Sequence, residues 1–159
     1  ILTPMDVQKR YFEEQLLVAV ECQRPVSIHI VRSWGILFEV LKSVKRRTKG
    51  RLPQKMYFHA FGGKSMTCRQ LLKACGDDVD VYFGFAPIIN FRSHKTGDVM
   101  KEVGLERLLL ETDLEDETRV YNDLIRGVEF VAEVFGLTVA EVVEQTGKNF
   151  LKFYKLDSQ

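Results

Sequence analysis

The sequence predicts an α/β protein in which about four parallel strands are covered by flanking helices, as a barrel or an open doubly wound sheet. Short apolar runs alternate with longer segments of helical periodicity, and this rhythm is typical of parallel sheets packed against helices. The chain has 159 residues, 45% of them apolar and 28% charged, which is enough for one domain with a proper core. We therefore expect a single α/β domain over residues 1–159.

The first half of the chain predicts alternating helices and strands. These elements cover residues 3–24, 25–31, 33–49, 55–60 and 65–75, beginning with a helix. Apolar side chains recur at helical spacing in the helices, and β-branched residues fill the first strand. Thr3 and Ser65 are the expected caps of the first and third helices, and Gly76 is the expected end of the third.

The second half continues this alternation and ends in two helices. We expect strands over residues 79–85 and 107–113, a looser helical piece over about 94–103, and a long helix over about 117–135. Gly136 ends the long helix. Thr138 and Glu141 have the spacing of a capping box, which opens the last helix.

Charge and cysteine content limit the class of protein. The net charge of +1 excludes a wholesale electrostatic grip on nucleic acid. A local grip stays open, because six basic residues fall within residues 42–51, although basic groups also favour a helix C-terminus. The three cysteines form no CxxC pair, which argues against a disulfide scaffold or structural zinc; we interpret them as small core residues.

The sequence shows neither a membrane span nor a secretory signal, and we take this to favour a place inside the cell. No apolar run approaches the ~20 residues of a membrane span, and the N-terminus lacks the layout of a secretory signal. An odd number of cysteines favours a reducing compartment. We expect an intracellular protein, cytoplasmic or nuclear, with no membrane partner.

Three of the four expected strands end in a residue that can bind a metal, namely His29, His59 and Asp113. The carboxyl ends of parallel strands meet at one edge, so these side chains are expected to lie close together. Two imidazoles and a carboxylate suit Zn²⁺, Mn²⁺ or Fe²⁺, or Mg²⁺ if more oxygens join. A single histidine at a strand end is more often a hydrogen-bonded core residue, so both interpretations stay open here.

Two further features have weaker chemical interpretations. The turn Phe61-Gly62-Gly63-Lys64-Ser65 is similar to a phosphate-cradling turn at a helix N-terminus, but it lacks the P-loop spacing and suits a flexible loop as well. Arg32 and Trp34 follow the first histidine and could line the mouth of the site, although helix packing is an equal alternative for Trp34.

Four stretches of the sequence resemble the C-terminal part of the TatD-type metal-dependent deoxyribonucleases, which are TIM-barrel relatives of the amidohydrolases. They are the helix over residues 8–15 leading into Pro25-Val26-Ser27-Ile28-His29, then His59-Ala60-Phe61-Gly62-Gly63, Leu109-Leu110-Glu111-Thr112-Asp113 and Thr146-Gly147-Lys148-Asn149-Phe150. The resemblance implies a partial (β/α)₈ TIM barrel of the metal-dependent hydrolase type. It also implies that His29, His59 and Asp113 are metal ligands, and that Asp113 contacts the attacking water.

The same resemblance implies a substrate and a cofactor. The family cleaves DNA phosphodiester bonds with a divalent ion, commonly Mg²⁺, with Zn²⁺ or Mn²⁺ as alternatives here. The family's His-x-His pair and bridging Glu belong to barrel strands that this sequence does not contain, and a whole barrel needs ~200 to 250 residues. We therefore expect the C-terminal portion of the barrel, with the N-terminal strands absent.

Local departures from the family leave three hypotheses. Ala-Phe-Gly-Gly follows His59 where the family usually has Cys-Phe-Ser-Gly, and Leu-Glu-Asp-Glu follows Asp113 where it usually has Ala-Pro. The leading hypothesis is a metal-dependent nuclease with DNA as substrate. The alternative is a catalytically degenerate TatD-like scaffold that binds a protein partner, and the third is a hydrolase of an amide or ester.

Overall fold

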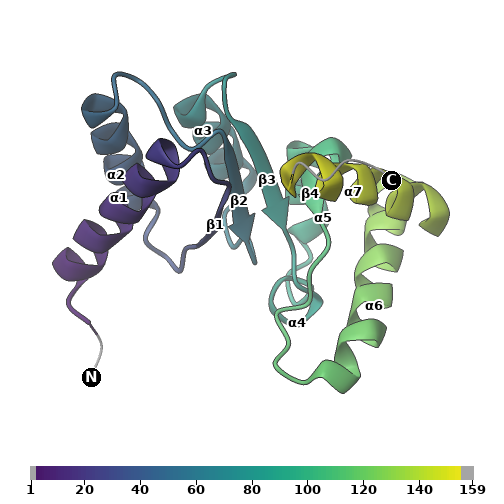
Figure 1. Cartoon of the computed structure of the whole chain (residues 1–159). Coiled ribbons are helices and arrows are strands. Elements are labelled where there is room, and N and C mark those ends of the chain that lie inside the picture. Colours follow the sequence, from purple (N-terminus) through teal and green to yellow (C-terminus); the bar gives the residue numbers. More distant parts are fainter. Residues whose placement is uncertain (1–2, 155–159) are drawn as a thin grey trace.

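The computed structural model describes residues 3–154 as a four-stranded parallel sheet with helices packed along it (Figure 1). The strands are β1 (Val26–His29), β2 (Lys55–His59), β3 (Asp80–Gly84) and β4 (Leu108–Leu109). The helices are α1 (Met5–Glu21), α2 (Trp34–Arg47), α3 (Ser65–Cys75), α4 (Pro87–Asn90), α5 (Thr96–Val103), α6 (Glu117–Phe135) and α7 (Val139–Tyr154), with a 3₁₀ turn at Leu105–Arg107.

The strands lie in the sheet in their chain order, β1-β2-β3-β4, and every pair is parallel. Each strand therefore reaches its neighbour through a helical crossover, as in a β/α barrel. The α/β class, the four parallel strands and the flanking helices predicted from the sequence are confirmed.

The helices also pack in chain order along the sheet. Contacts join α1 to α2, α2 to α3, α3 to α5, α5 to α6 and α6 to α7. Figure 1 shows α1 to α3 toward the β1 end of the sheet and α5 to α7 toward the β4 end. This succession of strands and covering helices is the arrangement of one arc of a barrel wall.

The main core lies between one face of the sheet and these helices. Alternate strand residues such as Phe58 and Phe83 are fully buried there, with their rings 5.7 Å apart. Leu37, Val40 and Val44 of α2 recur at helical spacing and are 0% exposed, so the predicted apolar stripe of this helix is the buried one.

The opposite face of the sheet carries a smaller apolar cluster. Tyr57, Tyr82 and Leu109 lie on three adjacent strands and are buried with Phe153 of α7. The Phe153 ring packs edge-on against Tyr57 at 6.0 Å and Tyr82 at 5.4 Å between centroids. This face turns polar toward the carboxyl ends of the strands, where the histidines lie.

Several expected element boundaries are wrong. Thr3 does not cap α1, since Pro4 holds the N-cap position and no side chain makes the cap hydrogen bond. Ser65 is the first residue of α3 rather than its cap, which is Lys64. The helix α4 was not expected, because a single turn has too few residues to show a helical period.

The ends of the two long helices follow the prediction. Gly136 ends α6 with φ 68°, a left-handed conformation that glycine adopts without cost. Thr138 and Glu141 form the reciprocal capping box, with the Thr138 amide donating to Glu141 and the Glu141 amide donating to Thr138 Oγ1.

The basic cluster over residues 42–51 is partly used by the fold itself. Arg47 pairs with Glu13 at 2.9 Å and with Glu14 at 2.7 Å, which joins α2 to α1. Lys45 donates to the carbonyl of Ala74 at 2.7 Å, at the C-terminal end of α3, where a cation is favoured. These contacts give two of the six basic residues a role in packing α2 against its neighbouring helices.

Within residues 3–154, every helix is too short or too polar to cross a lipid bilayer.

Candidate functional site

The candidate site begins with two histidines side by side at the carboxyl edge of the sheet. The register of the parallel strands pairs His29, the last residue of β1, directly with His59, the last residue of β2. Their ring centroids are 5.4 Å apart. The predicted juxtaposition of these two side chains is thus a consequence of strand register.

His59 lies between two carboxylates. Its Nε2 atom is 2.9 Å from Oδ1 of Asp113, and its Nδ1 atom contacts Oε2 of Glu111. The structure therefore brings Asp113 into contact with His59, one of the two histidines that it was predicted to approach. Glu111, however, contacts the other ring nitrogen of His59 and was not among the predicted site residues.

Glu111 is the buried centre of this network. Its side chain is 9% exposed, and both of its oxygens are engaged. Oε1 accepts from the Ala60 amide at 2.7 Å, and Oε2 accepts from the Tyr57 hydroxyl at 2.5 Å. A carboxylate with so many donors has a fixed orientation, so it fixes the ring of His59 in turn.

Gly84 has no side chain, and this leaves room for the Tyr57 hydroxyl and the Glu111 carboxylate. A Cβ atom at this position would lie 2.0 Å from the Tyr57 hydroxyl and 2.5 Å from Oε1 of Glu111. Gly84 is the last residue of β3, between the strand that carries Tyr57 and the segment that carries Glu111. Any side chain here would push the two hydrogen-bonding groups out of place.

Asp113 does not end a strand, contrary to the prediction. The ladder of β4 stops at Leu109, and Asp113 follows four residues later with φ 57°. Ala60 and Arg32 also have positive φ values, 43° and 53°, and follow β2 and β1. Non-glycine residues adopt this conformation only where the surrounding structure enforces it, and such positions concentrate at functional sites.

Charge and burial shift the pKa values of His59, Glu111 and Tyr57. Burial opposes the charged form of His59, yet attraction to Glu111 and the hydrogen bond to Asp113 outweigh it and raise the pKa of the imidazole. Burial raises the pKa of Glu111, an effect that the hydrogen bond from Tyr57 only partly offsets. Burial also raises the pKa of Tyr57, so its hydroxyl stays a donor to Glu111.

The donor set suits a divalent cation. His59 contacts a carboxylate at each ring nitrogen, Glu111 at Nδ1 and Asp113 at Nε2. If a cation displaced the Nε2 proton, Glu111 would hold the remaining proton at Nδ1 and Nε2 could ligate the cation. Imidazole nitrogens and a carboxylate are ligands for Zn²⁺, Mn²⁺ and Mg²⁺. Among residues 3–154, no group of three or more His, Cys, Asp or Glu side chains is arranged so that it could hold a metal ion.

Two of the weaker sequence candidates have structural roles. Trp34 packs edge-on against Phe61, with centroids 5.3 Å apart, which supports its helix-packing interpretation. Cys68 and Cys75 are buried, as expected, and burial raises the pKa of each thiol to about 11. Cys22 is exposed, so its expected place in the core is wrong.

Comparison with known proteins identifies relatives over nearly the whole chain. The family described as "TatD related DNase" matches residues 3–155. A Schizosaccharomyces pombe protein named deoxyribonuclease Tat-D is 35% identical over 113 residues, which cover 69% of this chain and 32% of the relative. An uncharacterised metal-dependent hydrolase of Bacillus subtilis, YabD, is 26% identical over 98% of this chain and 60% of its own length.

A solved structure shows the same fold. The crystal structure of YJJV, a TatD homologue from Escherichia coli K12, superposes with a TM-score of 0.75 at 22% identity, over 96% of this chain and 58% of the other. The chain thus spans between about a third and three fifths of the length of these relatives.

Proposed function

Because the chain belongs to the TatD related DNase family, we propose that it carries part of the active site of a metal-dependent hydrolase that cleaves DNA phosphodiester bonds. His29, His59 and Asp113 are the proposed metal ligands. Mg²⁺ is the first candidate for the cation, with Zn²⁺ and Mn²⁺ as alternatives. The observation that carries the proposal is the contact of His59 with both Asp113 and the buried Glu111.

In the proposed hydrolysis, Glu111 and Asp113 have different roles. Glu111 holds the Nδ1 proton of His59 and leaves Nε2 to face the cation position. Asp113 has a third of its side chain exposed, so its carboxylate can both ligate and accept a proton from an attacking water. A bound divalent cation would lower the pKa of a water that it ligates, and its positive charge would stabilise the phosphoryl oxygens.

The test is cleavage of a labelled DNA oligonucleotide by the full-length protein with Mg²⁺ or Mn²⁺. Asp113→Asn keeps the size of the side chain and removes its charge, and we expect the cleavage rate to fall by at least about 100-fold. Glu115→Gln is the matched control, an exposed carboxylate two residues away, and its rate should equal that of the unaltered protein. Equal rates for both variants would defeat the proposal.

The same assay separates the alternatives. A protein that cleaves no DNA, yet hydrolyses an ester or amide in an Asp113-dependent manner, has the metal-dependent activity with another substrate. A protein that shows no hydrolysis and binds no divalent cation fits the non-catalytic scaffold that binds a protein partner. Location in the cytoplasm or nucleus stays a prediction, as does a single domain over residues 1–159.

A further inference from the structure

Tyr57 belongs both to the smaller apolar cluster of the sheet and to the network around His59. It lies two residues before His59 on β2, so strand alternation puts both side chains on one face. Tyr57 is 9% exposed, and its ring centroid is 6.2 Å from that of His59. Its hydroxyl is 2.5 Å from Oε2 of Glu111, so a carboxylate connects this buried phenol to the candidate metal centre.

We propose that Tyr57 is a positioning residue of the candidate metal centre: its hydroxyl sets the orientation of Glu111, and Glu111 in turn holds the His59 ring. The inference rests on the proposed function, because it assigns a further residue to the same site. Tyr57 acts through Glu111 and is not assigned a contact with the cation or the substrate.

One oxygen of Glu111 contacts both Tyr57 and His59. Oε2 accepts from the Tyr57 hydroxyl, and the same atom contacts Nδ1 of His59. The last torsion of a glutamate side chain has broad, roughly two-fold minima, so the rotamer alone does not fix the plane of the carboxylate. A hydrogen bond from a hydroxyl to a carboxylate oxygen is strong and directional. The Tyr57 hydroxyl therefore determines where Oε2 lies, and with it the direction of the contact to His59.

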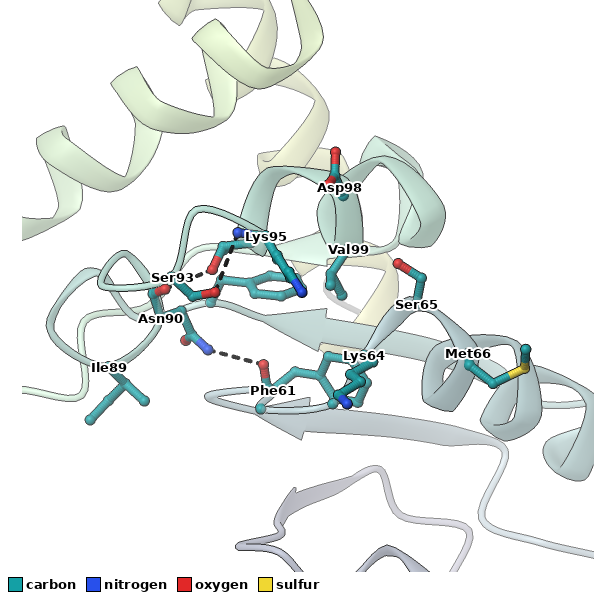
Figure 2. A pocket seen from close by; sticks show the side chains of 14 residues that line it. Phe61, Lys64, Ser65, Met66, Ile89, Asn90, Ser93, Lys95, Asp98 and Val99 are labelled. Carbon is teal, nitrogen blue, oxygen red and sulfur yellow. Dashed lines mark hydrogen bonds between the residues drawn. The ribbon is translucent and has the colours of Figure 1, made fainter.

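The other oxygen of Glu111 is held by the backbone. Oε1 accepts from the Ala60 amide at 2.7 Å. The next residue anchors this turn, because the Phe61 amide donates to the Gly84 carbonyl at 2.8 Å. Asn90 donates to the Phe61 carbonyl at 3.0 Å (Figure 2). The Ala60 amide is thus a fixed donor, but it restrains one oxygen only, and the carboxylate can still turn about that point.

Tyr57 is the side chain that completes the restraint. In the part of the chain that the structure describes, Glu111 contacts three polar groups, which are the Ala60 amide, the Tyr57 hydroxyl and the His59 ring. The amide restrains the first oxygen, and His59 is the group whose position is to be explained. Restraint of the second oxygen independently of His59 therefore depends on Tyr57.

The Tyr57 ring and hydroxyl are themselves held from two directions. Phe153 of α7 packs edge-on against the ring at 6.0 Å between centroids, a favourable aromatic geometry. Gly84 of β3 leaves the room that the hydroxyl needs, because a Cβ atom there would lie 2.0 Å from it. Helix α7 and strand β3 thus contribute to the orientation of Glu111 through Tyr57.

Tyr82 provides a matched control. It pairs in register with Tyr57 on the neighbouring strand, is buried, and packs against the same Phe153 ring at 5.4 Å. Its hydroxyl faces Lys152 rather than Glu111. Tyr57→Phe and Tyr82→Phe each remove one hydroxyl from the same apolar cluster and keep the ring, so a difference between the two variants reports the contact with Glu111.

The first measurement uses the full-length protein without metal or DNA. The nuclear magnetic resonance signal of the Ala60 amide reports on Glu111, because this amide donates to Oε1. In Tyr57→Phe we expect that signal to shift and the amide to exchange with solvent about tenfold faster, roughly the value of one hydrogen bond. Tyr82→Phe should leave both unchanged. An Ala60 amide that is unaffected by Tyr57→Phe, or affected equally by both variants, overturns the proposal.

The second measurement is the affinity for Mn²⁺ by isothermal titration calorimetry. Tyr57→Phe should weaken it about tenfold, the lower end of the effect of groups that orient metal ligands, and Tyr82→Phe should not change it. At saturating Mn²⁺, the KM of Tyr57→Phe for a DNA oligonucleotide should equal that of the unaltered protein, because Tyr57 acts on His59 and not on the substrate. An unchanged Mn²⁺ affinity together with a raised KM contradicts the positioning role.

The two proposals fail separately. If Asp113→Asn cleaves DNA at the full rate, the proposed nuclease centre is wrong, whereas the Ala60 measurement in the metal-free protein still decides whether Tyr57 orients Glu111. If Asp113→Asn is inactive and Tyr57→Phe binds Mn²⁺ as tightly as the unaltered protein, the nuclease function stands and the role of Tyr57 is refuted.

Discussion

The Nδ1 atom of His59 contacts Oε2 of Glu111, although 52 residues separate the two in the chain. The contact joins the end of β2 to the segment after β4, across the end of β3. A buried carboxylate behind an imidazole fixes the ring and its tautomer, so the opposite nitrogen faces outward. The metal-binding competence of His59 is therefore expected to depend on Glu111.

Glu111→Gln tests this dependence. The amide retains the shape of the side chain but loses the charge that orients His59, and we expect the affinity for Mn²⁺ to fall by about 10- to 100-fold. Isothermal titration calorimetry measures the affinity directly. Glu115→Gln, an exposed neighbour, is the control; if both variants bind Mn²⁺ as tightly as the unaltered protein, Glu111 has no orienting role.

Gly84→Ala should disrupt the same network from the strand side. Its new methyl group would lie 2.0 Å from the Tyr57 hydroxyl, and such overpacking costs about 1–3 kcal/mol. Urea unfolding measures the change in the free energy of unfolding. Gly35→Ala is the control, because nothing lies within 4 Å of its added Cβ and alanine favours a helix. A Gly84→Ala protein as stable as the control contradicts the close packing.

Asn149 joins α7 to the last strand. It is 4% exposed, and its Nδ2 donates to the carbonyls of Leu105 and Leu108, each at 2.8 Å. Asn149→Ala removes the side-chain donor to both carbonyls, of which that of Leu105 keeps the Leu108 amide, and we expect a loss of about 1–3 kcal/mol in the free energy of unfolding. Lys148→Ala breaks only an exposed pair with Glu144 and should cost less than about 1 kcal/mol. Similar losses for both variants would contradict this role of Asn149.

The pH dependence of stability should report on His59 when no metal is present. Attraction to Glu111 and the hydrogen bond to Asp113 outweigh burial and raise the pKa of His59 in the folded state above its usual value of about 6.5. The stabilisation is then complete below about pH 6.5 and is lost as the pH rises through the folded-state pKa.

Urea unfolding at a series of pH values checks this. The metal-free protein should lose stability across that window, and His59→Asn should show a flatter profile there because it lacks the titrating ring. If the two profiles run parallel from pH 6 to pH 9, His59 is not paired with the two carboxylates in solution.

Strand ends were the part of the site that the sequence predicted well. His29 and His59 end apolar, β-branched or aromatic runs, and parallel register alone puts them together. Asp113 instead lies beyond the short β4, which ends at Leu109. A segment of backbone outside the strand ladder therefore carries it to the site. The sequence pattern of a strand does not distinguish paired from unpaired extended backbone.

The supporting residues were missed for physical reasons. Glu111 lies two positions before Asp113 in an apolar run, so alternation puts both on one face, and that spacing was the available signal. Its partners Tyr57, Ala60 and Gly84 come from two other segments, and only the fold brings them together.

Anomalous diffraction from crystals of the full-length protein soaked in Mn²⁺ tests the central claim most directly. The account predicts a manganese peak within about 2–2.3 Å of ring nitrogens of His29 and His59 and of a carboxylate oxygen of Asp113, and loss of that peak in Asp113→Asn. A peak elsewhere, or a site that keeps its metal when Asp113 is replaced, would contradict the assignment of these three ligands.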